Sequence, residues 1–217
     1  MKKKHTLRNV VITIIVLELI VGGIVFGYKK LHSNEDNNSL SLSDPLVLEL
    51  YQKVDFNDLD ILDIMSDDAK LYYGYHNLGT KETVDCSEVE IEDDTTGYTC
   101  IEEDNFIPSS TLLEAVYDVY GSDTSVTVKS FPITENIYGY YSSLLDGIVL
   151  YEKEEQVVVD PINMKLTDAT KEDENIIITV QVLDGIFGTE LESYNYTFRQ
   201  VDDEYHLVQK ETINLDN

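Results

Sequence analysis

Residues 176–183 read IIITVQVL, and this stretch, with 193–199 (SYNYTFR) and 205–210 (YHLVQK) after it, decides the fold class of the 217-residue chain. All three runs are rich in the β-branched and aromatic residues that favour strands. The first run follows the charged segment 171–175, and segment 202–204 separates the second run from the third. Because such short connections join antiparallel neighbours, the C-terminal part of the chain predicts a curved antiparallel meander.

Shorter β-rich runs precede these three, and helical patterns come before them all. The shorter runs predict strands at residues 125–129, 137–141, 148–151, 156–159 and 163–168. We therefore expect residues 44–121 to be mainly helical and residues 122–215 to be mainly strands. Helices followed by an antiparallel sheet indicate the α+β class, with the helices packed on one face of the sheet. The sequence leaves open whether the two regions form one domain or two.

Two segments early in this region carry helix-start signals. Asp44 precedes Pro45, and because proline is favoured at the first helical position, we expect a helix to begin there. A second helix is expected to begin at Ser66, which two acidic residues follow in the first turn, and to end at Gly79.

A third helix is predicted further along the chain. Thr111 and Glu114 have the spacing of a capping box, in which each side chain binds a free backbone N–H of the other residue. Gly121 then provides a residue that commonly ends helices. The segment TLLEAVYDVY between these signals is therefore expected to be helical.

Cys86 and Cys100 are the only cysteines in the chain. In an extracytoplasmic domain such a pair is expected to form a disulfide, and closing a loop of about 15 residues contributes on the order of 3 kcal/mol. Val89 and Ile91 alternate with acidic residues and Gly97 marks a turn, so the segment predicts a β-hairpin that the disulfide closes at its base. A redox role would require C-x-x-C spacing and a nearby basic group, and this segment has neither.

A single membrane-spanning helix is predicted by residues 10–28, VVITIIVLELIVGGIVFGY. As a helix this segment extends roughly 28 Å, close to the hydrocarbon thickness of a bilayer. A cleavable signal would have a shorter apolar region and a small-residue cleavage site, which the sequence lacks. Four basic residues before the span and two after it predict that residues 1–9 are cytoplasmic. Residues 29–43 are then a linker, and residues 44–217 an extracytoplasmic domain at the cell membrane.

Three residues of this span are candidates for contacts between membrane helices: Glu18, Gly23 and Gly27. A carboxylate in mid-bilayer costs roughly 3 kcal/mol and usually faces a partner helix or is protonated; the alternative is one acid tolerated among apolar neighbours. Gly23 and Gly27 fit the G-x-x-x-G motif of closely packed helices. At about 100° per residue they lie nearly opposite Glu18. The span therefore offers two faces, one for a homodimer and one for a membrane-protein partner.

The charge of the remaining chain excludes one class of partner. Residues 31–217 hold 41 acidic and nine basic residues, a formal charge of −32. Such a field repels nucleic acid, so we expect no nucleic-acid partner. The 42% apolar content and the 15 tyrosines favour a folded domain over a disordered acidic tail.

We find no motif for catalysis, for a cofactor or for a metal. His76 and His206 belong to no G-x-S-x-G or H-E-x-x-H pattern, and a cap or core position is the commoner role of a residue such as His76. The acidic run 55–63 fails the calcium-loop template because Asp60 stands where glycine is required. Residues 88–94 fit the solvent-facing side of a strand. We therefore predict no catalytic, cofactor-binding or metal-binding residues.

Several segments together resemble an uncharacterised group of membrane-anchored proteins from low-GC Gram-positive bacteria. Besides the lysine-rich anchor, these are KLYYGYHNL (70–78), IPSSTLLEAVYDVYGSD (107–123) and YNYTFR with DEYHLV (194–199 and 203–208). The resemblance covers most of the chain but implies no known activity, so no residue inherits a role from it. The closing strands also resemble the end of NTF2-like and cystatin-like sheets, a fold-level likeness without chemical content.

The sequence favours a binding module at the cell surface, in contact with the bilayer through residues 10–28 and with an unidentified protein or surface ligand. The alternative is a cell-envelope enzyme, such as a glycan hydrolase that uses two carboxylates. A third possibility is an accessory subunit that another membrane protein holds through Glu18.

Overall fold

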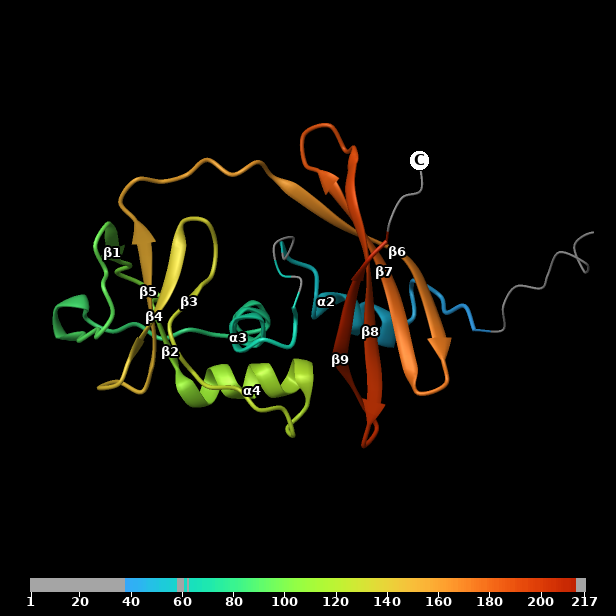
Figure 1. The fold of residues 1–217 in the computed structure, drawn as a ribbon, viewed down its shortest axis with the longest axis horizontal. Coiled ribbons are helices and arrows are strands. Elements are labelled where there is room, and N and C mark those ends of the chain that lie inside the picture. Colours follow the sequence, from blue (N-terminus) through green and yellow to red (C-terminus); the bar gives the residue numbers. More distant parts are fainter. Residues whose placement is uncertain (1–37, 58–60, 62, 214–217) are drawn as a thin grey trace, which may run out of the picture. The chain divides into compact units, whose positions relative to one another are not determined.

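The computed structural model describes residues 38–57, 61 and 63–213 (Figure 1). The described residues from Leu40 onward belong to one compact unit. They form three α-helices, one short 3-10 helix and two antiparallel sheets, which confirms the α+β class. The sequence predicted a single sheet, and the presence of two is the main correction to the expected architecture.

The C-terminal sheet is the predicted meander, with the strand order β6-β7-β8-β9. Its strands are β6 (Ile162–Glu172), β7 (Asn175–Asp184), β8 (Glu190–Val201) and β9 (Glu204–Thr212). Tight turns join β6 to β7 and β8 to β9, and both contain aspartates with positive φ, among them Asp173 at 53° and Asp203 at 71°. Aspartate tolerates this left-handed conformation better than most side chains do, so the charged segments seen in the sequence are the turns.

Side chains that alternate along the strands explain why the meander forms. One face of β7 is buried and the other is half-buried. The residues of the buried face lie opposite aromatic residues of the neighbouring strand β8. These buried residues are Ile176, Ile178, Val180 and Val182 on β7, and Tyr194, Tyr196 and Phe198 on β8. Each fully buried side chain of this size stabilises the fold by about 1.5–3 kcal/mol. More buried side chains pack in the cluster of this sheet than in the clusters of the other one, so the meander carries the larger core.

The first two helices, α2 (Pro45–Gln52) and α3 (Asp67–His76), begin where the sequence predicts. The side chain of Asp44 accepts a hydrogen bond from the backbone N–H of Leu46 at 2.9 Å. Ser66 accepts one from the N–H three residues further on, at 3.2 Å. Both side chains satisfy backbone donors that a helix start leaves without partners.

The end of α3 differs from the prediction. The helix ends at His76, three residues before Gly79. The side-chain Nδ2 of Asn77 donates to the carbonyl of Tyr73 at 2.9 Å and to that of Lys53 at 3.1 Å. Asn77 therefore caps the last turn and ties it to the end of α2, so the glycine is not needed to stop the helix.

The third helix, α4 (Ser109–Tyr120), starts two residues before the predicted capping box. Pro108 is its N-cap residue, and no side chain caps this end. The first N–H of the helix instead donates to the carbonyl of Asp146 at 2.9 Å. Thr111 and Glu114 lie inside the helix, where the backbone N–H of Glu114 already has an intrahelical partner, so the predicted capping box is wrong.

Glycines at two positions fit the packing of the helices. A Cβ on Gly74 of α3 would lie 2.5 Å from Cγ2 of Val116 on α4, so these helices approach closely. Gly121 ends α4 as predicted, with a φ of 89° that side-chain-bearing residues rarely adopt.

The other sheet has the order β1-β5-β4-β3, and β2 also pairs with β5. Its strands are β1 (Tyr98–Cys100), β2 (Phe106–Pro108), β3 (Phe131–Pro132), β4 (Ile137–Ser142) and β5 (Gly147–Lys153). The runs predicted at 137–141 and 148–151 correspond to β4 and β5. The remaining strands are only two or three residues long, too short to give a period-2 pattern.

Two predicted strands are wrong, because side chains hold those segments instead of a neighbouring backbone. Residues 125–129 lie along α3: Lys70 Nζ donates to the carbonyl of Ser125 at 2.8 Å, and Lys129 Nζ lies 2.8 Å from Oδ1 of Asp68. Residues 156–159, in the connection between β5 and β6, also form no strand.

The predicted hairpin at 86–100 is also wrong. The 3-10 helix η1 (Cys86–Glu88) follows Asp85, and β1 pairs with β5 rather than with residues 88–94. The alternation of apolar and acidic residues in this segment is nevertheless kept, because Val89 and Ile91 pack inward while the acidic residues next to them are exposed.

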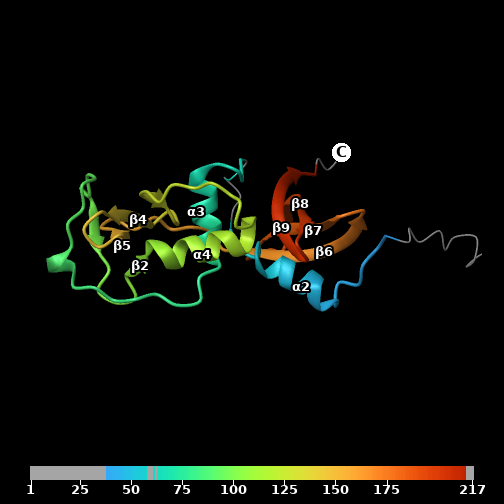
Figure 2. The same cartoon turned by 90° about the horizontal axis from the view of Figure 1, so that it is seen from below.

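Helices α3 and α4 place side chains in the cores of both sheets. Tyr73 and Val116 belong to the core of the meander, and Leu71 and Leu112 to the core of the other sheet. Figure 2 shows α4 extending from β2 towards β9, and the helix contacts both strands.

Candidate functional site

The predicted membrane contacts lie outside the described residues. This holds for the span at residues 10–28 and for Glu18, Gly23 and Gly27 within it. None of the helices in the described ranges is long and apolar enough to cross a bilayer. The span therefore stays a prediction.

The predicted disulfide between Cys86 and Cys100 is confirmed. Asn105, which the sequence did not single out, is fully buried at the base of the loop that this disulfide closes. Its Nδ2 donates to the carbonyl of Ile101 at 2.6 Å and to that of Val84 at 3.1 Å. Its Oδ1 accepts from the N–H of Val84 at 2.9 Å. One amide thus bridges the two ends of the loop, and a lone asparagine gives no pattern by which sequence analysis could find it.

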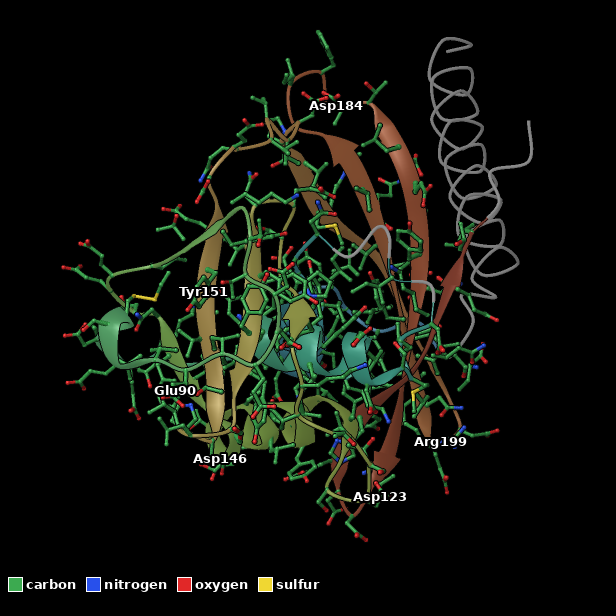
Figure 3. All side chains as sticks on the ribbon, turned by 60° about the vertical axis from the view of Figure 1, so that its left-hand side comes forward. Glu90, Asp123, Asp146, Tyr151, Asp184 and Arg199 are labelled. Carbon is green, nitrogen blue, oxygen red and sulfur yellow. A yellow bond between two sulfur atoms is a disulfide. The ribbon has the colours of Figure 1, made fainter. Side chains whose placement is uncertain are left out.

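The disulfide-closed loop covers one face of the sheet formed by β1–β5, which we call the first sheet. Val89 and Ile91 pack on a buried cluster that includes Tyr151, and Ser142 Oγ donates to the carbonyl of Glu90 at 2.9 Å. Figure 3 shows the loop, with Glu90, beside the strand that carries Tyr151. The apolar side chains of the loop therefore belong to the packed core of this sheet, and its carboxylates face solvent.

His76 lies in an aromatic cluster at the end of α3. Its ring stacks on Phe56 with 4.5 Å between centroids, and Tyr72 and Tyr75 flank it at 4.5 and 5.2 Å. Its Nε2 is buried without a hydrogen-bond partner in the described part of the chain. Burial and the nearby charge of Lys81 lower the pKa of His76 to about 4, although a hydrogen bond with the backbone of Ile133 opposes the shift. The ring is therefore neutral at pH 7 and packs as a core residue.

His206 on β9 is also buried, and it packs against the end of α4. A Cβ at Gly121 would lie 3.2 Å from its Cδ2. Its Nε2 lies 3.8 Å from Oε2 of Glu204, and its Nδ1 has no partner among the described residues. The structure does not bring His76 and His206 together, and each contributes to packing at a different place.

An open pocket of about 370 Å³ lies beside the end of α3, lined by residues 78–81 and Asp104. Lys81, its one cation, donates to the hydroxyl of Tyr75 at 2.7 Å. In the described ranges no group of three or more histidines, cysteines or carboxylates could hold a metal ion. The acidic run 55–63 is only partly among the described residues.

The turn between β7 and β8 exposes two large apolar side chains. Ile186 is 64% exposed and Phe187 82%. Oδ1 of Asp184 accepts hydrogen bonds from both of their backbone N–H groups, at 2.8 and 2.6 Å. Gly188, with a φ of 66°, donates its N–H to the carbonyl of Asp184 at 2.8 Å. Asp184, labelled in Figure 3 at the end of β7, therefore fixes a turn that holds Ile186 and Phe187 in solvent.

The connection between β5 and β6 exposes three valines. Val158 is 94% exposed, and Val157 and Val159 are also exposed. The Asn136 side chain binds the backbone of Val157 twice: its Nδ2 donates to the carbonyl at 2.8 Å and its Oδ1 accepts from the N–H at 2.6 Å. As at the turn, one polar side chain fixes an exposed apolar segment.

These two segments meet at one end of the meander. The N–H of Gly185 donates to the carbonyl of Pro161 at 2.8 Å, and Ile162 pairs with Asp184. Leu191, also exposed, lies just after the turn, at the start of β8. We name this region the apolar surface, and its members are Val157, Val158, Val159, Ile186, Phe187 and Leu191.

The apolar surface was not predicted from the sequence. Residues 156–159 were predicted to be a strand, and no role was predicted for residues 184–188. A signal was present in DGIFG (184–188), because two large apolar residues between turn-forming glycines have no strand or helix face on which to be buried.

The chain matches no known family model, no curated protein and no solved structure. The resemblance to membrane-anchored proteins of Gram-positive bacteria and the likeness to NTF2-like and cystatin-like sheets therefore stay predictions.

Proposed function

We propose that this protein is a binding module that residues 10–28 anchor in the cell membrane, with its α+β domain outside the cytoplasm. The observation that carries this proposal is the apolar surface. Scattered exposed apolar residues are ordinary, but large ones on two segments that a backbone hydrogen bond joins at the end of a sheet are candidates for a protein–protein contact site. Phe187 is the side chain best suited to be an anchor in a partner's pocket, since aromatic residues dominate binding energies.

The hydrogen bonds that hold the two segments of the apolar surface support a binding role. Asp184 and Asn136 each hold their segment through two hydrogen bonds to the backbone. A segment that is already ordered loses less conformational entropy when it binds, so more of the contact energy remains as affinity.

Two features support the location. Residues 10–28 are long and apolar enough for one span, and the basic residues around them favour a cytoplasmic N-terminus. The disulfide between Cys86 and Cys100 fits an oxidising compartment outside the cytoplasm.

Site-specific photo-crosslinking in cells of the native host tests the proposal. A photoreactive phenylalanine analogue at Phe187 should form a protein adduct that Ile186→Ser abolishes. The same analogue at Leu144, which is 64% exposed in another turn, is the matched control and should form none. Protease added outside intact cells should remove the adduct. If positions 187 and 144 give the same adducts, or if external protease spares them, the proposal fails.

A further inference from the structure

Acidic residues border the apolar surface on every segment that forms it. Segments 154–162 and 183–193 contain six acidic residues and no basic one. These are Glu154, Glu155, Asp160, Asp184, Glu190 and Glu192. Along both segments, the charged residues beside the exposed valine, isoleucine, leucine and phenylalanine side chains are therefore all negative.

This border decides between the possible occupants. A second copy of the chain would bring an identical negative border against it, and like charges that face each other across an interface disfavour association. The charge of −32 on residues 31–217 adds long-range repulsion. A bilayer surface that contains anionic lipids meets the same repulsion.

A protein whose contact patch has a positively charged border meets no such repulsion. We infer that the apolar surface binds a protein partner whose contact patch has apolar side chains at its centre and lysine or arginine at its border. Phe187 and Ile186 enter the partner's apolar centre, while the partner's basic side chains face the exposed carboxylates of the two segments. This inference rests on the proposed binding function and adds the chemistry of the partner to it.

The complementary charges have a kinetic consequence. Charge pairs at the rim of an interface remain partly hydrated, so they change the rate of association more than the strength of the complex. The affinity should then depend mainly on the central apolar side chains, and the association rate on salt.

The absence of tryptophan makes the surface easy to probe, because one introduced tryptophan is the only one in the protein. The full chain with Phe187→Trp, reconstituted in lipid nanodiscs, is titrated with an amphipathic peptide whose leucine face is bordered by lysines. We expect a saturable blue shift of the emission. Adding Ile186→Ser and Val158→Ser should weaken binding about 30-fold. Leu144→Trp is the matched control and should show no shift.

Three further measurements can overturn the inference: a second peptide, brominated lipids and a protein concentration series. A twin peptide with glutamate in place of each lysine should cause no shift, because like charges then face each other across the interface. An equal shift with both peptides would rule out a basic border on the partner. Quenching of Phe187→Trp by brominated lipids would identify the bilayer as the occupant, and a shift that grows with protein concentration alone would identify a second copy. No shift with the lysine peptide also overturns the inference. In that case, crosslinks at Phe187 in cells would leave the proposed function standing.

Discussion

At the scale of single residues, His76 couples the fold to pH. Its folded-state pKa is about 4, against 6.5 for an unperturbed histidine, because burial among aromatic rings and the charge of Lys81 disfavour the protonated form. Between these two pH values the unfolded chain binds a proton that the folded chain does not. This contribution to stability is therefore intact above about pH 6.5 and is lost as the pH falls towards 4.

The loss should amount to about 3 kcal/mol when fully developed. The variant His76→Phe keeps an aromatic ring beside Phe56 and removes the titration. Urea unfolding at about pH 7 and about pH 4 should show that the wild type loses stability relative to the variant on acidification. Other groups titrate in both proteins, so only the difference between them counts. Parallel pH profiles would contradict this account of His76.

At the scale of elements, the loop between Cys86 and Cys100 should depend on its disulfide. Residues 87–97 of the loop pair with no strand, and only its last three residues, β1, pair with β5. The double variant Cys86→Ser and Cys100→Ser should lose on the order of 3 kcal/mol in unfolding free energy.

Limited proteolysis distinguishes a local effect from a global one. In the double serine variant, cleavage should appear within residues 87–99 before it appears in β6–β9. Cleavage that starts in the meander would mean that the disulfide stabilises the whole domain rather than this loop. The wild type without reductant is the control.

The sequence predicted elements well where each strand pairs with its neighbour along the chain. Runs such as 176–183 alternate cleanly because one face is buried, and their short turns specify their partners. The first sheet was predicted less well, because β5 pairs with β1, β2 and β4 from separate parts of the chain. The alternation of apolar and acidic residues in 88–94 indicated which side chains are buried, but it could not indicate which strand, if any, pairs with this segment.

The candidate site could not be predicted, for a related reason. Asn136 and Val157 are distant in sequence, and only the folded chain brings them into contact. Sequence periodicity reveals faces that are buried. The apolar surface lies in a turn and a connection, where no periodicity exists.

At the scale of the whole molecule, charge is the dominant property. Two of the nine basic residues in segment 31–217 point inward: Lys53 Nζ donates to the carbonyl of Asp118 at 2.7 Å, and Lys70 Nζ to that of Ser125 at 2.8 Å. The 41 acidic residues of this segment therefore remain largely without compensation at the surface.

Salt should consequently stabilise the fold. Raising NaCl from about 10 mM to about 1 M shortens the Debye length from about 30 Å to about 3 Å and screens the repulsion among surface carboxylates. We expect the thermal midpoint to rise steadily over this range, measured by circular dichroism at pH 7. A midpoint that falls or stays level with added NaCl would contradict this.

The side chains of Asp184 and Asn136 hold the two segments of the apolar surface in place, whereas other side chains of these segments are exposed for contact. Asp184 and Asn136 bind backbone groups, so these hydrogen bonds do not involve the side chains that residues 158, 186 and 187 carry. Under the proposed binding function, the turn between β7 and β8 and the connection between β5 and β6 exchange their exposed side chains, and with them the partner, while the scaffold that presents them stays the same. Variable loops on β-sheet scaffolds change what they recognise in this way.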